Sequence, residues 1–109
     1  MSFSYLRRNR EAQAAPMAQA TNEVGFALCR AQSGQLTRGP VAEGTPVGVN
    51  IPVSCPSGTR FVGLFHTHPG GVAAPSDKDL RAGQATGSRN LCILVPESGE
   101  LACYRRKRP

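Results

Sequence analysis

The sequence contains no tryptophan, and aromatic residues make up only 6% of it, so the interior must be built mainly from aliphatic side chains. Long apolar runs are also absent, because no stretch approaches the roughly 20 residues that a membrane-spanning helix needs. Residues 1–10 hold no apolar segment of the kind found in signal peptides. These absences predict a protein without a membrane segment, and cytoplasmic localisation is the default expectation.

The four cysteines include no C-x-x-C pair, which argues against a zinc knuckle or ribbon. Cys29, Cys92 and Cys103 lie in apolar, strand-like stretches, where a cysteine behaves as a small buried hydrophobe. Cys55 lies in a polar stretch and is expected to be more exposed. We therefore expect free thiols that support the fold, no metal ligation by sulfur, and a reducing intracellular compartment.

Acidic residues are scarce, with 7 against 13 basic ones, and the net charge is +6. The basic residues gather at both ends, in residues 7–10 and 105–108, whereas the middle is close to neutral. We expect flexible, solvated ends at about residues 1–10 and 104–109. An acidic protein partner or nucleic acid is the alternative explanation for this charge. Nucleic acid is the weaker of the two, because only Tyr104 offers an aromatic ring beside the C-terminal run.

The length of 109 residues predicts a single domain, and the 12 glycines and 9 prolines predict many turns. The pattern of apolar residues favours a mixed α/β domain with a mainly β centre. The continuous apolar run "LCILV" is typical of a central strand. Helices are expected at Tyr5–Ala20, interrupted at Pro16, and at Ser76–Thr86. Strands are expected at residues 23–30, from about Leu36, at Val47–Val53, at residues 60–68, at residues 91–95 and at residues 101–105.

The only two histidines of the chain, His66 and His68, are one residue apart. On a strand, residues i and i+2 point the same way, so both imidazoles can reach one metal ion. A catalytic zinc site needs a third protein ligand, and Asp79 can supply it if the intervening loop folds back over the strand end. The competing interpretation is an accidental surface pair. Ser76 and Asp79 also have the spacing of a capping box at a helix start, which is compatible with metal binding.

The pattern H-x-H, seven residues, then S-x-x-D resembles the signature of the JAMM (MPN-plus, JAB1/MPN/Mov34) zinc metalloproteases, and "FVGLF" before the first histidine resembles the strand of that family. The resemblance implies an α/β fold consisting of a single MPN domain, cytidine-deaminase-like, with a mixed β-sheet flanked by short helices. It also implies that His66, His68 and Asp79 bind Zn²⁺ and that Ser76 stabilises the oxyanion. The distant glutamate of the family corresponds to Glu23 in "NEVGFALCR", which would act as general base. Glu43 is a competitor, but no strand signal follows it.

Members of this family cut isopeptide or peptide bonds after the C-terminal Gly-Gly of ubiquitin-like or sulfur-carrier proteins. The resemblance therefore implies a deubiquitinase-like (iso)peptidase with such a protein as substrate. The chain has little room for the insertions that grip ubiquitin in eukaryotic members, so a compact prokaryotic or phage type is expected. Three alternatives stay open: a non-catalytic MPN-type binding module, a phage tail-assembly or RadC-like member, and a small basic nucleic-acid-binding protein.

Overall fold

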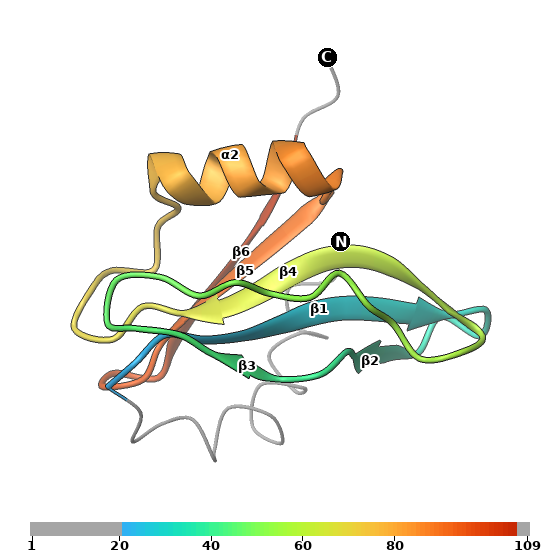
Figure 1. The fold of residues 1–109 in the computed structure, drawn as a ribbon, viewed down its shortest axis with the longest axis horizontal. Coiled ribbons are helices and arrows are strands. Elements are labelled where there is room, and N and C mark those ends of the chain that lie inside the picture. Colours follow the sequence, from blue (N-terminus) through green and yellow to red (C-terminus); the bar gives the residue numbers. More distant parts are fainter. Residues whose placement is uncertain (1–20, 107–109) are drawn as a thin grey trace.

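The computed structural model describes residues 21–106, which form one mixed sheet with a helix across one of its faces (Figure 1). The strands follow the order β2-β1-β4-β5-β6, and β3 also pairs with β1. All neighbours are antiparallel except β4 and β5, which are parallel. The elements are β1 (Val24–Ala31), β2 (Leu36–Arg38), β3 (Ala42–Glu43), β4 (Thr59–Thr67), α2 (Asp77–Thr86), β5 (Asn90–Val95) and β6 (Glu100–Arg105).

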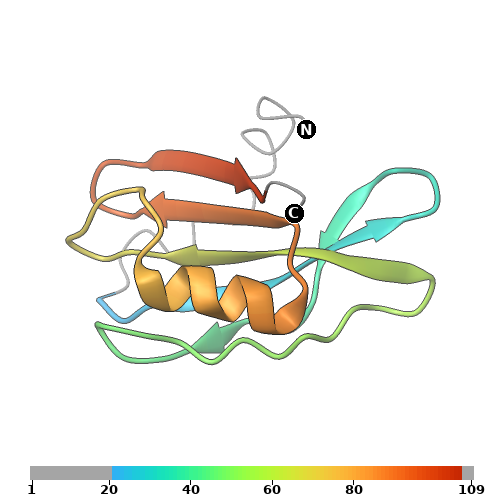
Figure 2. The same ribbon diagram turned by 90° about the horizontal axis from the view of Figure 1, so that it is seen from above.

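The parallel pair determines where the helix lies. Parallel neighbours need a crossover connection, and α2 provides it between β4 and β5. The helix therefore runs along the sheet, with its first turn beyond the carboxyl end of β4 (Figures 1 and 2). This arrangement brings the residues that follow β4 next to the beginning of α2.

The core lies on both faces of the sheet. The larger cluster is centred on Phe26 and Phe65, whose rings stack at 4.5 Å between centroids. A smaller cluster on the other face contains Ala73, Ile93 and Val95. Strands β1 and β5 supply residues to both faces, as the predicted central position of "LCILV" requires. The predicted mixed α/β domain with a mainly β centre is confirmed for the described residues.

The segment between β3 and β4 departs from the prediction. A strand at Val47–Val53 was expected, but the residues there form only one isolated bridge, between Thr45 and Gly48. Pro52 lacks the N–H that a strand ladder requires. The segment is held instead by side chains. Ile51 packs so closely on Gly25 of β1 that a Cβ there would lie 2.6 Å from the Ile51 side chain.

The expectation of free thiols is wrong, because all four cysteines are paired. The Cys29–Cys55 disulfide ties the segment before β4 to β1, and Cys92–Cys103 joins two residues that face each other on β5 and β6. The Cys29–Cys55 pair depends on where the irregular segment before β4 lies against β1, and the Cys92–Cys103 pair depends on the register of the β5–β6 hairpin. Disulfides are typical of oxidising compartments, so the cysteines no longer support the predicted cytoplasmic localisation.

The flexible C-terminal end was predicted to begin at about residue 104, but residues 104–106 make specific contacts in the structure. Tyr104 and Arg105 belong to β6, the Tyr104 hydroxyl donates a hydrogen bond to the carbonyl oxygen of Ala73, and the Arg106 N–H donates to the carbonyl oxygen of Arg89 at 2.9 Å. The predicted helix at Tyr5–Ala20 and the last three residues lie outside the described part of the chain. Within residues 21–106, no helix has the length and apolar character to cross a membrane.

Candidate metal centre

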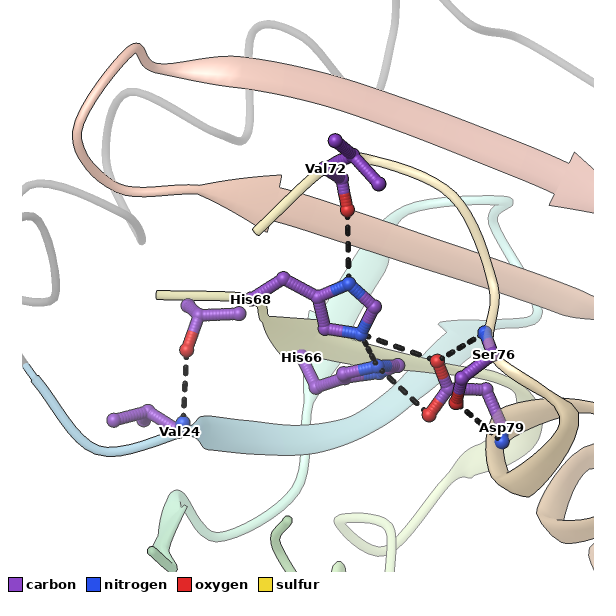
Figure 3. A network of polar contacts seen from close by, with 7 residues as sticks. Val24, His66, His68, Val72, Ser76 and Asp79 are labelled. Carbon is purple, nitrogen blue, oxygen red and sulfur yellow. Dashed lines mark hydrogen bonds and ion pairs between the residues drawn. The ribbon is translucent and has the colours of Figure 1, made fainter. Parts of the chain in front are cut away.

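The two histidines lie at the carboxyl end of β4, on the face that α2 covers (Figure 3). His66 is paired with Ile93 of β5, and the His68 N–H donates to the carbonyl oxygen of Leu94 at 2.9 Å, so the extended backbone continues through His68. Both rings therefore point the same way, as the i, i+2 spacing predicts. Their Nε2 atoms are 2.9 Å apart.

Asp79 completes a tight set of ligand atoms. Its two carboxylate oxygens lie 3.2 Å from Nε2 of His66 and 3.1 Å from Nε2 of His68. Ligand atoms about 2.0–2.1 Å from a tetrahedral zinc ion are roughly 3.3 Å from one another. The two nitrogens and the carboxylate are thus spaced as three ligands of one ion, and their chemistry suits zinc.

A capping box fixes Asp79 at the start of α2. The Ser76 Oγ accepts a hydrogen bond from the Asp79 N–H at 3.1 Å, and the Asp79 carboxylate accepts one from the Ser76 N–H at 2.9 Å. Burial on its own raises the pKa of Asp79, but the hydrogen bonds from His66 and Ser76 and the attraction to His66 outweigh it. The pKa of Asp79 is therefore held well below its usual range, and the carboxylate is ionised and available for a cation.

The loop between His68 and Ser76 is anchored by main-chain contacts. Gly70 has a φ of 67°, a left-handed conformation that glycine adopts without strain, and its N–H donates to the Glu97 carboxylate at 3.0 Å. The Tyr104 hydroxyl holds the carbonyl of Ala73. The carbonyl oxygen of Val72 is 2.9 Å from Nδ1 of His68. A carbonyl only accepts, so His68 Nδ1 carries the proton and Nε2 offers its lone pair to a metal.

Glu23 lies immediately before β1, close to the histidines but less tightly than Asp79. One of its carboxylate oxygens falls in a group with the His66 and His68 nitrogens whose atoms all lie within 4.8 Å of one another. Its backbone pairs with the turn after β3, and the neighbouring Val24 N–H donates to the buried Thr67 hydroxyl at 2.9 Å (Figure 3). Burial raises the pKa of Glu23, against the opposing attraction of the two histidines.

The residues predicted for the site are thus brought together: His66, Asp79, Ser76 and Glu23 line one small pocket with a volume of about 70 Å³, and Nε2 of His68 lies 3.1 Å from the Asp79 carboxylate. The competitor Glu43 is not among the residues that line this pocket. It lies on β3, and its carboxylate accepts a hydrogen bond from the Asn22 side chain at 3.0 Å.

A model of the prokaryotic homologs of the JAB domain matches residues 7–107. The chain belongs to this family. The JAB-domain fold also appears in the crystal structure of a JAB1/MPN domain protein from Archaeoglobus fulgidus, with a TM-score of 0.52 and 20% identity over 94% of this chain and 82% of that one. No curated protein matches the sequence of this JAB domain. The predicted family and fold are therefore confirmed, and the similarity in structure concerns the fold alone.

Sequence reasoning missed several contributors to the site of this JAB domain. Val72, Glu97 and Tyr104 support the loop through hydrogen bonds, and the first of these uses only a main-chain atom, which leaves no trace in residue type. Lys78 lines the pocket beside Asp79. Its place within S-x-x-D was a visible signal, because a lysine is unfavourable in the first turn of a helix.

Proposed function

We propose that this domain is a zinc-dependent (iso)peptidase that hydrolyses the bond after the C-terminal Gly-Gly of a ubiquitin-like or sulfur-carrier protein. One observation carries the proposal. Two imidazole nitrogens and a carboxylate converge at metal-ligand spacing, while a second carboxylate, that of Glu23, lies beside them in the same pocket. Structural zinc sites are closed by four protein ligands, whereas catalytic sites use three and leave one position open.

His66, His68 and Asp79 would hold the zinc ion, each through an atom that already faces the other two. A bound zinc ion would polarise the substrate carbonyl and lower the pKa of a coordinated water from 15.7 to about 7. The Val72 carbonyl would keep the His68 ring in the required orientation and tautomer. The capping box would do the same for the Asp79 carboxylate.

Glu23 would accept the proton of the attacking water and later donate it to the leaving amine. A general base works best with a pKa near the working pH, and burial shifts the pKa of Glu23 in that direction. Glu23 is anchored through its backbone to the turn after β3, and its carboxylate is not part of the close contacts that Asp79 makes with the two histidines.

Ser76 would donate a hydrogen bond to the developing oxyanion. Its Oγ already accepts from the Asp79 N–H, so the hydroxyl proton is available for a second partner. Ser76 also lines the pocket. Removal of one oxyanion donor typically costs 10²–10³ in kcat.

The substrate assignment rests on the family, whose members cut after a C-terminal Gly-Gly. The net charge of +6 would attract an acidic carrier protein.

The test is Glu23→Gln, with Glu43→Gln as matched control. We expect Glu23→Gln to keep zinc and fold and to lower the hydrolysis of a Gly-Gly-linked fusion by about 10²–10⁴, whereas Glu43→Gln retains activity. Mass spectrometry of the products and elemental analysis of zinc provide the readouts. If zinc-loaded wild type cleaves no Gly-Gly-linked substrate, or if only Glu43→Gln is inactive, the proposal is wrong.

A further inference from the structure

Lys78 has a position that the proposed zinc site does not explain. It lies in the first turn of α2, where acidic residues favour a helix and a cation opposes it. Among residues 21–106 its ammonium group has no hydrogen bond and no salt bridge. A lysine that has no hydrogen bond or salt bridge within the described part of the chain, yet lines the pocket beside Asp79 and within electrostatic reach of Glu23, is available to a ligand.

The ammonium group lies against the turn after β3, at Gly48. A Cβ on Gly48 would lie only 2.3 Å from Nζ of Lys78, so the absence of a side chain there makes room for the ammonium. The same turn is paired with Glu23, whose N–H donates to the Thr45 carbonyl at 2.8 Å and whose carbonyl accepts from the Gly44 N–H at 2.8 Å. Lys78 and Glu23 therefore lie on one side of the pocket.

That side is where the leaving group must lie, because Glu23 hands its proton to the leaving amine in the proposed function. Apolar residues also line this pocket, among them Ile51, Leu64, Ala82 and Leu91. The pocket is small and opens to solvent, so a small side chain fits best against these apolar residues. The leaving residue is therefore expected to have a small aliphatic side chain with an anionic group close to its nitrogen.

We propose that Lys78 determines specificity by binding the α-carboxylate of a single C-terminal residue that is released from a linear peptide. When the leaving group is the α-amine of a terminal residue, one carbon atom separates its nitrogen from the carboxylate. The carboxylate is then within reach of a cation beside Glu23. In an isopeptide the leaving nitrogen is a lysine ε-amine, which has no carboxylate near it. The inference rests on the proposed function and narrows its substrate class to a carboxy-terminal trimming reaction.

The reaction balances with water as the only co-reactant. The peptide C–N bond breaks, and the oxygen of water forms the new C–O bond of the shortened chain. One proton of the water passes through Glu23 to the departing nitrogen, which leaves as the amine of a free amino acid. Its carboxylate stays ionised throughout and pairs with the Lys78 ammonium.

The test compares a Gly-Gly-Ala peptide that ends in a free acid with the same peptide ending in a carboxamide. With zinc-loaded full-length protein, we expect kcat/KM to favour the acid by about fivefold, the upper range for an exposed ion pair. Lys78→Met should bring the ratio of acid to amide close to one, and Lys78→Arg should retain the preference. Gly48→Ala should weaken it, since the added methyl group displaces the ammonium. Arg81→Met, which alters an exposed cation of α2 outside the pocket lining, is the control and should match wild type.

A second readout separates this inference from the proposed function. The dissociation constants of both peptides are measured with zinc-loaded Glu23→Gln, which requires no turnover. If the acid binds more tightly than the amide and Lys78→Met removes this difference, the inference is supported. This holds even if no variant hydrolyses peptide, because a lack of hydrolysis would refute only the proposed hydrolase function. Equal binding and equal hydrolysis of acid and amide by wild type overturn the inference while leaving the hydrolase intact. A preference that survives Lys78→Met overturns it too.

Discussion

The sheet and helix α2 lie against each other but are held in place by different means. Strand β1 has six consecutive buried residues and β5 has four, whereas none of the ten residues of α2 is buried. Leu80, the largest apolar side chain of the helix, is 54% exposed. The sheet is therefore stabilised by packed side chains on both faces, and α2 depends mainly on contacts at its first turn.

The difference teaches that stability and the proposed chemistry come from separate parts of the molecule. The capping box and the contacts of Asp79 with the two histidines attach the beginning of α2 to the end of β4. A metal ion at this point would tie the weakly packed helix to the sheet. Substitutions in the core of the sheet should accordingly change the free energy of unfolding. Substitutions at the first turn of α2 should change the metal content.

The largest expected effect is that of His68→Ala on the helix side of the comparison. We expect this variant to lose most of its zinc and all hydrolytic activity, because two ligands do not hold a catalytic zinc ion. Elemental analysis after dialysis without chelator measures the metal. Hydrogen exchange should be faster than in zinc-loaded wild type in Asp77–Thr86 and unchanged in β5. Full zinc retention would show that the metal site is assigned to the wrong residues.

On the sheet side, Phe26→Ala should lower the free energy of unfolding by about 3–5 kcal/mol, the usual cost of removing a buried aromatic ring. Phe26 is 1% exposed and stacks on Phe65. Leu80→Ala in α2 is the matched truncation and should change stability by less than about 0.5 kcal/mol. Urea unfolding gives both values, and zinc per folded molecule should be unaffected in both. Similar losses in the two variants would mean that α2 is packed as firmly as the sheet.

Ser76→Ala should have an intermediate effect, since it removes a helix cap and the proposed oxyanion donor together. The cap contributes about 1 kcal/mol to stability, and the hydroxyl should contribute about 10²-fold to kcat. Ser76→Thr keeps an oxygen at the same place and is the control for both. A loss of stability without a loss of kcat in Ser76→Ala would leave the residue with a capping role only.

The smallest effect concerns acid stability without metal. The pKa of Asp79 is lowered in the folded protein, so its ionised form contributes stability above the unfolded value of 3.8, and this contribution is lost as pH falls below it. In metal-free protein, urea unfolding should therefore show a steeper fall in stability below about pH 4 for wild type than for Asp79→Asn. Parallel curves for the two proteins would contradict the pKa assignment.

The site was predictable because its signals are local. The i, i+2 spacing of His66 and His68 and the Ser76–Asp79 capping box each depend on a few neighbouring residues, and both are present in the structure. The strands were predictable for the same reason, from the alternation in β1 and the apolar run of β5. Glu23 required the family resemblance, because nothing in its immediate neighbours distinguishes it from a solvated residue at a strand edge.

The remaining features depend on contacts between distant parts of the chain. The Cys29–Cys55 disulfide spans 26 residues, and the Tyr104–Ala73 hydrogen bond spans 31. Such pairs each join a strand to an irregular segment far away in the sequence, and no short window of sequence contains both partners. The segment that replaces the predicted strand at Val47–Val53 is also positioned from outside, by Ile51 on Gly25.

The hydrogen bonds that connect the loop between β4 and α2 to the β5–β6 hairpin use main-chain atoms of the loop, the N–H of Gly70 and the carbonyl of Ala73. The side chains in both contacts, Glu97 and Tyr104, come from the hairpin. In evolutionary terms, the side chain of Val72 can drift more freely than that of the buried Ala73, whereas the length of the loop cannot change, because an insertion would move both contact points at once. Changes in loop length among related chains should therefore be inherited together with changes in the hairpin.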